Sequence, residues 1–392
     1  MPRFSIIIPF YDGLENITEA VSSVLDQSYD DVEVIVVDDC DPDRSGNKLD
    51  RMFAADSRVS VLHRRQNGGT LRARREGVLA SMGEYVLLLD QDDALVEGAL
   101  DGISAVLDET PVDILHFGVD VIAETQSATA AREGMESFLR PPVRLLQGEE
   151  ILTKQFAFDN RFDWHVHHKT YRGDFARDCW ARAADENLAL SDDLYLSFIL
   201  ASRAQSYRAV ADAWYVYHLG RGETLAGNYD INKLMRVSRL DARALALLRD
   251  YVMAPENASM RGDWNERLVD VRDHLIEHVA NEMADGLSLK ERDKAITAIA
   301  VDWEPDALAG ELWRFVRDRA YALFESRSYP DKNDDLYLLI SQAREVDARV
   351  DGEGSVRYRL MHDAANRHLA DLETIAPISR RVIRAFTRRL RG

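Results

Sequence analysis

Short apolar runs alternate with amphipathic segments along the first 90 residues of the chain. The runs lie at residues 4–9, 32–37, 58–62 and 84–89. Their length and β-branched content predict buried strands. From Ile17 to Leu25, apolar residues recur at helical spacing, which is typical of a helix packing one face on a sheet. Strand, helix and strand within about forty residues predict a βαβ unit with parallel strands.

The pattern changes after an aromatic, strand-like run at residues 214–218. Glycines near residues 220–224 follow it, and apolar residues then recur at helical spacing. The predicted helices cover residues 233–252, 264–287, 289–301, 305–326 and 334–350. A chain of 392 residues is also long for one compact core. We therefore predict an α/β domain at residues 1–225 and an all-helical domain at 226–392, which packs on the first domain or pairs subunits.

Acidic residues follow two of the predicted strands. Asp38-Asp39 ends the second strand, and Asp90-Gln91-Asp92-Asp93 ends the fourth. Open α/β sheets bind ligands at the carboxyl ends of their strands, and unpaired buried carboxylates are unfavourable. A divalent cation would make the cluster favourable, so Asp90 and Asp92 are candidate ligands of Mg²⁺ or Mn²⁺. His218 is the third candidate, and the alternative is a solvated acidic turn.

Several further motifs appear in an order that resembles a known family. They are SIIIPFY at residues 5–11, VLDQSY at 24–29, EVIVVDD at 33–39, NGG at 67–69, AR at 73–74, GEYVLLLDQDD at 83–93, KTYR at 169–172 and SDDLYL at 191–196. Together they resemble the family 2 inverting glycosyltransferases over roughly residues 3–225. Asp12, Asp41, Arg75 and Asp192 stand where that family usually has Asn, Ser, Asn and Glu.

The resemblance implies an A-type, Rossmann-like fold with a mostly parallel central sheet, followed here by the all-α region. It implies a metal-dependent enzyme with a DXD motif at Asp90-Gln91-Asp92. Such an enzyme moves a sugar from a nucleotide-sugar, a UDP-hexose or UDP-N-acetylhexosamine, to a glycan or lipid-linked glycan. The expected setting is bacterial surface polysaccharide synthesis.

The resemblance also implies roles on the donor side of the site. Asp38 would accept the imide N–H of the base, Tyr11 would stack on it, and Asp90 would bind the ribose or a metal-bound water. Arginines early in the helix after Gly69 would bind the pyrophosphate. The expected nucleotide-sugar residues are Pro9, Tyr11, Asp38, Asp39, Gly69, Arg72, Arg74, Asp90 and Gln91.

Inversion by single displacement needs one base that takes the proton of the acceptor hydroxyl. Asp192 and Asp193 begin a predicted helix, where the helix dipole alone would favour acidic residues. The resemblance favours catalysis, with Asp193 as the base and Asp192 beside it. The residues expected along the acceptor groove are Trp164, His165, His167, His168 and Lys169, with a loop at residues 124–142 shaping the pocket. Alternation along a strand would put His168 opposite His165 and His167, which disfavours a zinc site.

Composition bounds the partners and the compartment. The net charge of −19 disfavours nucleic-acid binding, and only two cysteines, Cys40 and Cys179, fit a reducing compartment. No apolar run is long enough for a membrane span, so we expect a cytoplasmic protein without a signal peptide. Residues 377–392 carry six arginines and no acid. This tail would either contact the inner face of the membrane or fold back on its acidic body.

Two other classes of function remain open from the sequence. A sugar nucleotidyltransferase would share the sheet and Mg²⁺, and residues 68–72 weakly resemble its glycine-rich loop. That loop should follow the first strand, however, where Pro9-Phe10-Tyr11-Asp12 stands. A non-catalytic partner protein acting through the helical half is the third class.

Overall fold

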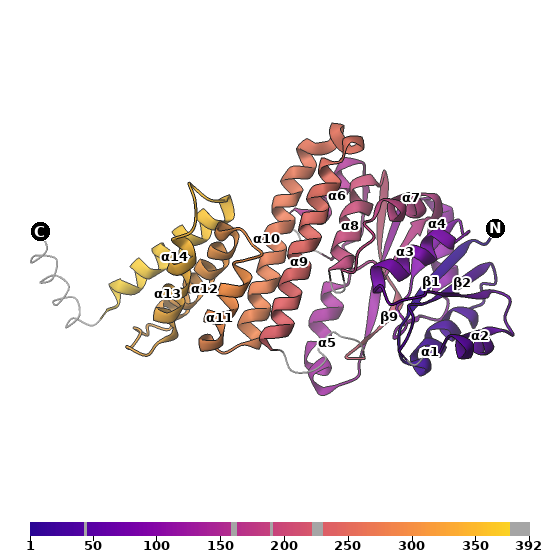
Figure 1. The fold of residues 1–392 in the computed structure, drawn as a ribbon, viewed down its shortest axis with the longest axis horizontal. Coiled ribbons are helices and arrows are strands. Elements are labelled where there is room, and N and C mark those ends of the chain that lie inside the picture. Colours follow the sequence, from indigo (N-terminus) through magenta and orange to yellow (C-terminus); the bar gives the residue numbers. More distant parts are fainter. Residues whose placement is uncertain (43–44, 158–162, 189–190, 222–229, 377–392) are drawn as a thin grey trace, which may run out of the picture. The chain divides into compact units, whose positions relative to one another are not determined.

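The computed structural model describes residues 1–42, 45–157, 163–188, 191–221 and 230–376 (Figure 1). The chain divides into two compact units. The first comprises Met1–Asn228 with Arg243–Asp270, and the second comprises Tyr229–Ala242 with Val271–Gly392. Helices α9 (Ile231–Met253) and α10 (Arg261–Gly286) therefore contribute residues to both units. The boundary predicted near residue 225 and the tail at 377–392 lie outside the described residues.

One half of the central sheet is parallel. Its strands are β1 (Phe4–Phe10), β2 (Val32–Asp38), β3 (Val59–His63) and β4 (Tyr85–Leu88), in the order β3-β2-β1-β4. Ile6, Ile7 and Ile8 of β1 are all fully buried, so both faces of this strand are covered. That burial explains why its sequence is a continuous apolar run rather than an alternating one.

The other half of the sheet mixes strand directions. Strand β8 (Lys169–Arg172) is antiparallel to both β4 and β6 (Ile114–Ala123), and β9 (Ser206–Leu219) runs parallel to β6. The short strands β5 (Ala94–Leu95) and β7 (Arg144–Gln147) pair antiparallel with β9. Six of the nine strands share one direction, so the predicted mostly parallel sheet is confirmed.

Helices of the first unit connect these strands. They are α1 (Leu14–Leu25), α2 (Gly46–Phe53), α3 (Thr70–Ala80), α4 (Ala99–Glu109), α5 (Gln126–Phe138), α6 (Glu149–Phe156), α7 (Gly173–Arg182) and α8 (Asp192–Arg203). Helix α3 packs closely on the sheet, because a Cβ atom at Gly77 would lie 2.3 Å from Cγ2 of Ile7. This close packing fixes the position of Arg74, one turn earlier in the helix.

Helix α5 corrects one prediction from the sequence. Residues 124–142 were expected to form a loop, but Gln126–Phe138 is helical. The Thr125 side chain caps the helix by accepting a hydrogen bond from the N–H of Ala128 at 3.1 Å. Among the helix residues only Ala128 is buried. The apolar stripe that normally identifies a helix is therefore nearly absent from its sequence.

The regular elements of the second unit, within its described residues, are all helices. Besides its parts of α9 and α10, it contains α11 (Leu289–Ile299), α12 (Pro305–Glu325), α13 (Asp335–Asp347) and α14 (Val356–Thr374). The predicted all-α region is confirmed, with α14 as a helix that was not predicted. Fully buried Glu311 on α12 accepts hydrogen bonds from Arg314 at 2.6 Å and from Arg357 on α14 at 2.7 Å. In the described part of the chain, no helix combines the length and hydropathy of a membrane span.

Candidate active site

A cavity of about 430 Å³ opens at the carboxyl ends of β1 and β4. Predicted site residues that line it are Pro9, Tyr11, Asp39, Arg74, Asp90, Gln91, Asp92, Asp192 and Asp193. The sequence analysis did not assign Phe10, Thr70, Ala73, Asp93 and Tyr217, which also line it. Trp164, His165 and His167 complete the lining, whereas His168 and Lys169 are absent from it. The acceptor role expected of these residues stays a prediction. The structure thus gathers residues from both halves of the first unit around one cavity.

Arg74 joins carboxylates from three distant segments. Its Nη2 donates to Oδ1 of Asp90 at 2.6 Å, and its Nη1 donates to Asp193 at 2.5 Å and to Asp192 at 3.2 Å. Arg74 is only 3% exposed. Burial alone would lower its pKa, but the carboxylates raise the pKa well above its usual value. Its guanidinium therefore binds the acidic side chains of the site, whereas the sequence analysis expected it to bind pyrophosphate.

Asp192 and Asp193 start helix α8 but differ in environment. The Asp192 side chain is 7% exposed and that of Asp193 is 16% exposed. Burial, together with the negative charge of Asp193, raises the pKa of Asp192 to about 7. Asp193 is the more exposed of the two and therefore the more accessible to a molecule in the cavity. The geometry therefore favours Asp193 over Asp192 as the group that meets an acceptor.

Hydrogen bonds from β9 fix the acidic loop that follows β4. The Tyr215 hydroxyl accepts a hydrogen bond from the N–H of Asp90 at 3.2 Å and donates one to Asp93 at 2.7 Å. Asp93 also accepts from the backbone N–H of His218 at 2.8 Å. Burial raises the pKa of Asp93 well above its usual value. The aromatic run at residues 214–218 could have indicated this support, because alternate residues of a strand point to the same side.

Asp90 and Asp92 fit the donor set of a hard divalent cation. Burial and the nearby charge of Asp90 raise the pKa of Asp92, so its ionised form lacks full compensation from the protein. Carboxylate oxygens are the ligands that Mg²⁺ prefers. His218 does not line the cavity, although its charge helps to lower the pKa of Asp92, and its role as a third ligand stays a prediction. Its Nδ1 lies 2.7 Å from Glu124 and its Nε2 lies 3.7 Å from Glu19.

Three residues expected on the donor side make other contacts. Oδ2 of Asp38 lies 2.8 Å from Nδ1 of His63, and Asp38 does not line the cavity. Arg72 donates to the Asp185 side chain at 2.5 Å and to its carbonyl at 2.7 Å. Gly69, with φ of +84°, donates its N–H to Asp39 at 2.7 Å. Their predicted roles toward the nucleotide remain predictions.

Asp39 occupies the backbone donors of the glycine loop before α3. Its carboxylate accepts the N–H groups of both Gly68, at 2.9 Å, and Gly69, and it also pairs with Arg64. Helix N-termini often bind phosphate through such donors. Here the Asp39 carboxylate occupies these two N–H groups in place of a phosphate. The sequence alone could not show this contact.

A second polar cluster surrounds Asp163, next to the cavity. His116 and His168 approach one Asp163 oxygen at 3.0 and 2.8 Å, and Lys169 approaches the same oxygen at 3.1 Å. Among the described residues, His116, Asp163 and His168 alone form a metal-like group, with ligand atoms within 4.8 Å. The Lys169 ammonium, however, already provides the positive charge that compensates the buried carboxylate. Burial lowers the pKa of His168 to about 4.

The backbone around these histidines also corrects the sequence analysis. The segment at residues 165–168 is irregular and ends in a turn before β8, which begins only at Lys169. The expected strand alternation was therefore wrong. Instead, the turn directs His168 toward Asp163, while His165 and His167 line the cavity.

Comparison with known proteins shows which proteins this chain resembles. Residues 5–177 match the family model described as glycosyl transferase family 2. The uncharacterized glycosyltransferase EpsJ of Bacillus subtilis strain 168 is 28% identical over 227 residues, covering 55% of this chain and 61% of EpsJ. TarS of Staphylococcus aureus strain MW2, a poly(ribitol-phosphate) beta-N-acetylglucosaminyltransferase, is 25% identical over 267 residues, covering 65% of this chain and 43% of TarS.

Both of these matches span less than two thirds of the relative's own length. The crystal structure of S. aureus TarS 1–349 in complex with UDP-GlcNAc has a TM-score of 0.53 and 18% sequence identity to this chain. The match covers 93% of this chain and 92% of that chain, and it shows a shared fold. Over residues 5–177, the chain therefore resembles glycosyl transferase family 2 in sequence.

Proposed function

We propose that this chain transfers a sugar, with inversion, from a UDP-sugar to a hydroxyl group of a surface glycan or lipid-linked glycan. The observation that carries the proposal is the cluster around Arg74, which places Asp193 of α8 and Asp90 of the DXD motif in one cavity. An inverting transfer needs this juxtaposition, because the acceptor base and the donor must meet across one sugar.

The names of the relatives narrow the expected substrates. TarS has been crystallised with UDP-GlcNAc and is named for transfer to poly(ribitol-phosphate). We therefore favour a UDP-N-acetylhexosamine as donor, with a UDP-hexose as the alternative, and a bacterial cell-surface polymer as acceptor. No feature of the cavity favours a sugar nucleotidyltransferase or a non-catalytic partner protein.

The residues of the cavity have separate roles in this mechanism. Asp193 takes the proton of the acceptor hydroxyl as its oxygen attacks the anomeric carbon, while Arg74 fixes the orientation of the carboxylate. Tyr11, with 46% of its surface exposed, offers a ring to the base. Asp90 and Asp92 would hold Mg²⁺ or Mn²⁺, which would neutralise charge on the departing diphosphate.

Release of UDP from a panel of UDP-sugars tests this function. With Mn²⁺ or Mg²⁺ present, we expect one donor to release UDP, and an added glycan acceptor to accelerate that release. Chelation of the metal should abolish it. Formation of a nucleoside triphosphate from the UDP-sugar and pyrophosphate would instead indicate a nucleotidyltransferase, and the absence of both reactions with every donor would contradict catalysis.

Asp92→Ala tests the metal assignment. We expect it to abolish metal-dependent UDP release without unfolding the protein, because it removes a cation ligand. In metal-free buffer its melting temperature should equal or exceed that of the wild type, since burial already raises the pKa of this carboxyl. Asp212→Ala, at an exposed position on β9, is the matched control. Activity close to that of the wild type in Asp92→Ala would remove Asp92 from the metal site.

A further inference from the structure

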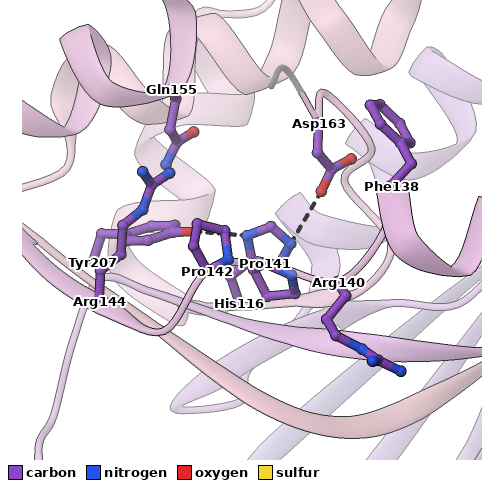
Figure 2. Close-up of a pocket in the computed structure, with 9 residues that line it drawn as sticks. All are labelled: His116, Phe138, Arg140, Pro141, Pro142, Arg144, Gln155, Asp163 and Tyr207. Carbon is purple, nitrogen blue, oxygen red and sulfur yellow. Dashed lines mark hydrogen bonds and ion pairs between the residues drawn. The ribbon is translucent and has the colours of Figure 1, made fainter. Parts of the chain in front are cut away.

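A second cavity, of about 400 Å³, lies in the first unit, separate from the candidate active site (Figure 2). Five elements and the segments between them form it. The lining residues from these elements are His116 of β6, Phe138 of α5, Arg144 of β7, Gln155 of α6 and Tyr207 of β9. Arg140, Pro141 and Pro142, between α5 and β7, and Asp163, before β8, complete the lining. None of them was assigned to the donor or to the base. We call it the arginine cavity.

The arginine cavity is rich in hydrogen-bond donors. The guanidinium of Arg144 lies over the ring of Tyr207, with Cζ 5.7 Å from the ring centroid. Among the residues that the structure describes, its buried Nε has no hydrogen-bond acceptor. Nε2 of Gln155 is likewise buried without an acceptor. Figure 2 shows the two side chains pointing toward one another. Buried donors without acceptors are unfavourable, so this geometry favours a ligand that brings oxygen atoms.

The acid that lines the cavity does not neutralise these donors. Asp163 is engaged by His116, His168 and Lys169, and among the described residues no carboxylate forms an ion pair with Arg144. Arg140 adds a second guanidinium, whose Nη2 lies 3.0 Å from Glu136 on α5. In a chain with a net charge of −19, a cavity with two arginines stands out from the average surface and is suited to an anion.

The arginine cavity adjoins the acceptor side of the active-site cavity. Asp163 lines the former, and the next two residues, Trp164 and His165, line the latter. The rings of Phe138 and His165, one from each lining, have centroids 6.1 Å apart. A polymer that presents a hydroxyl to Asp193 therefore has a neighbouring cavity within reach of its adjacent units.

We propose that the arginine cavity binds an anionic group of the acceptor glycan, a phosphate or a uronate carboxylate. This proposal rests on the glycosyl transfer proposed above. The guanidinium of Arg144 can donate two parallel hydrogen bonds to two oxygens of such a group, and the amide of Gln155 can donate a third hydrogen bond to a ligand oxygen. Phe138 and the two prolines supply apolar surface against which a sugar or polyol backbone packs.

Binding of glycerol 3-phosphate, followed by ³¹P NMR with UDP and Mg²⁺ at saturation, tests the proposal. Saturating UDP keeps the probe out of the donor site, and ionic strength is held constant. We expect saturable binding that glucuronate displaces and methyl glucoside does not. Arg144→Gln should weaken it about tenfold or more, because a charge-assisted hydrogen bond is lost. Gln155→Met should weaken it less. Arg132→Gln, an exposed arginine on α5, should have no effect.

The outcomes separate this proposal from the proposed function. Equal binding to wild type and Arg144→Gln, equal displacement by the neutral sugar, or no binding by the wild type would each overturn the anion subsite. UDP affinity is measured on the same variants and should be unchanged. A wild-type protein that binds the probe but never releases UDP from any donor would overturn the transfer function instead.

Discussion

Replacing Asp193 with Asn is expected to lower the turnover number by about a hundredfold or more while UDP-sugar affinity is retained. The change removes the lone pairs and charge that accept the hydroxyl proton, which is the contribution typical of a general base. The amide oxygen can still accept the hydrogen bond from Arg74 that holds the side chain at 2.5 Å. Initial rates of UDP release with acceptor, together with calorimetric titration of the UDP-sugar, measure the two effects separately.

Two comparisons make the Asp193→Asn result specific. Asp174 lies in the first turn of another helix, α7, and its side chain is 70% exposed. Asp174→Asn should therefore leave both turnover and UDP-sugar affinity unchanged. Asp192→Asn should reduce turnover less than Asp193→Asn, because the Asp192 side chain is 7% exposed against 16% for Asp193 and so is less accessible to an acceptor. Loss of donor affinity in parallel with turnover would assign Asp193 to the donor site.

Arg74→Met is expected to lower the free energy of unfolding by about 3–5 kcal/mol at neutral pH. Removing one partner of a buried ion cluster leaves the other charges uncompensated, and Arg74 contacts three carboxylates. Urea unfolding followed by tryptophan fluorescence measures the loss. Arg72→Met is the control on the same helix, and it should cost much less because its partner Asp185 is 77% exposed. Equal losses in the two variants would contradict a special role for Arg74.

The destabilisation of Arg74→Met should grow as the pH rises. Without the guanidinium, which lowers it, the pKa of Asp192 in the folded protein rises further above the value in the unfolded chain, about 3.9. The folded form then binds more protons than the unfolded form, and its stability falls as the pH increases through that window. The deficit relative to the wild type should be small near about pH 4 and complete above about pH 8. A deficit that does not change with pH would contradict this account.

The sequence predicted the first unit well where local pattern decides the structure. Continuous apolar runs identified β1, β2 and β4 because those strands are buried on both faces. Acidic residues at the ends of β2 and β4 indicated the correct edge of the sheet. Helix α5 escaped prediction because only Ala128 among its residues is buried. The turn before β8 was not predicted, because strand alternation was assumed for residues 165–168, which do not form a strand.

The partners of the site residues were much harder to predict. The sequence shows that Arg74 and Asp193 are present, but their contact spans 119 positions and depends on how α3 and α8 meet. Asp39 could equally have met a ligand or the N–H groups of the glycine loop, and only the fold decides for the latter. A sequence motif therefore predicts which residues gather around one cavity, whereas long-range packing determines which hydrogen-bond donor meets which acceptor.

The amide of Gln91 joins the two loops that would hold the two ends of the donor. Its Oε1 accepts a hydrogen bond from the N–H of Tyr11 at 2.9 Å, and its Nε2 donates to the carbonyl of Asp12 at 2.5 Å. Gln91 itself stands between Asp90 and Asp92. If the acidic loop binds a cation as proposed above, that cation would also order the loop that carries Tyr11, and nucleotide and cation affinities would be thermodynamically coupled. That coupling is reciprocal: whatever factor the cation adds to UDP affinity, UDP must add to cation affinity.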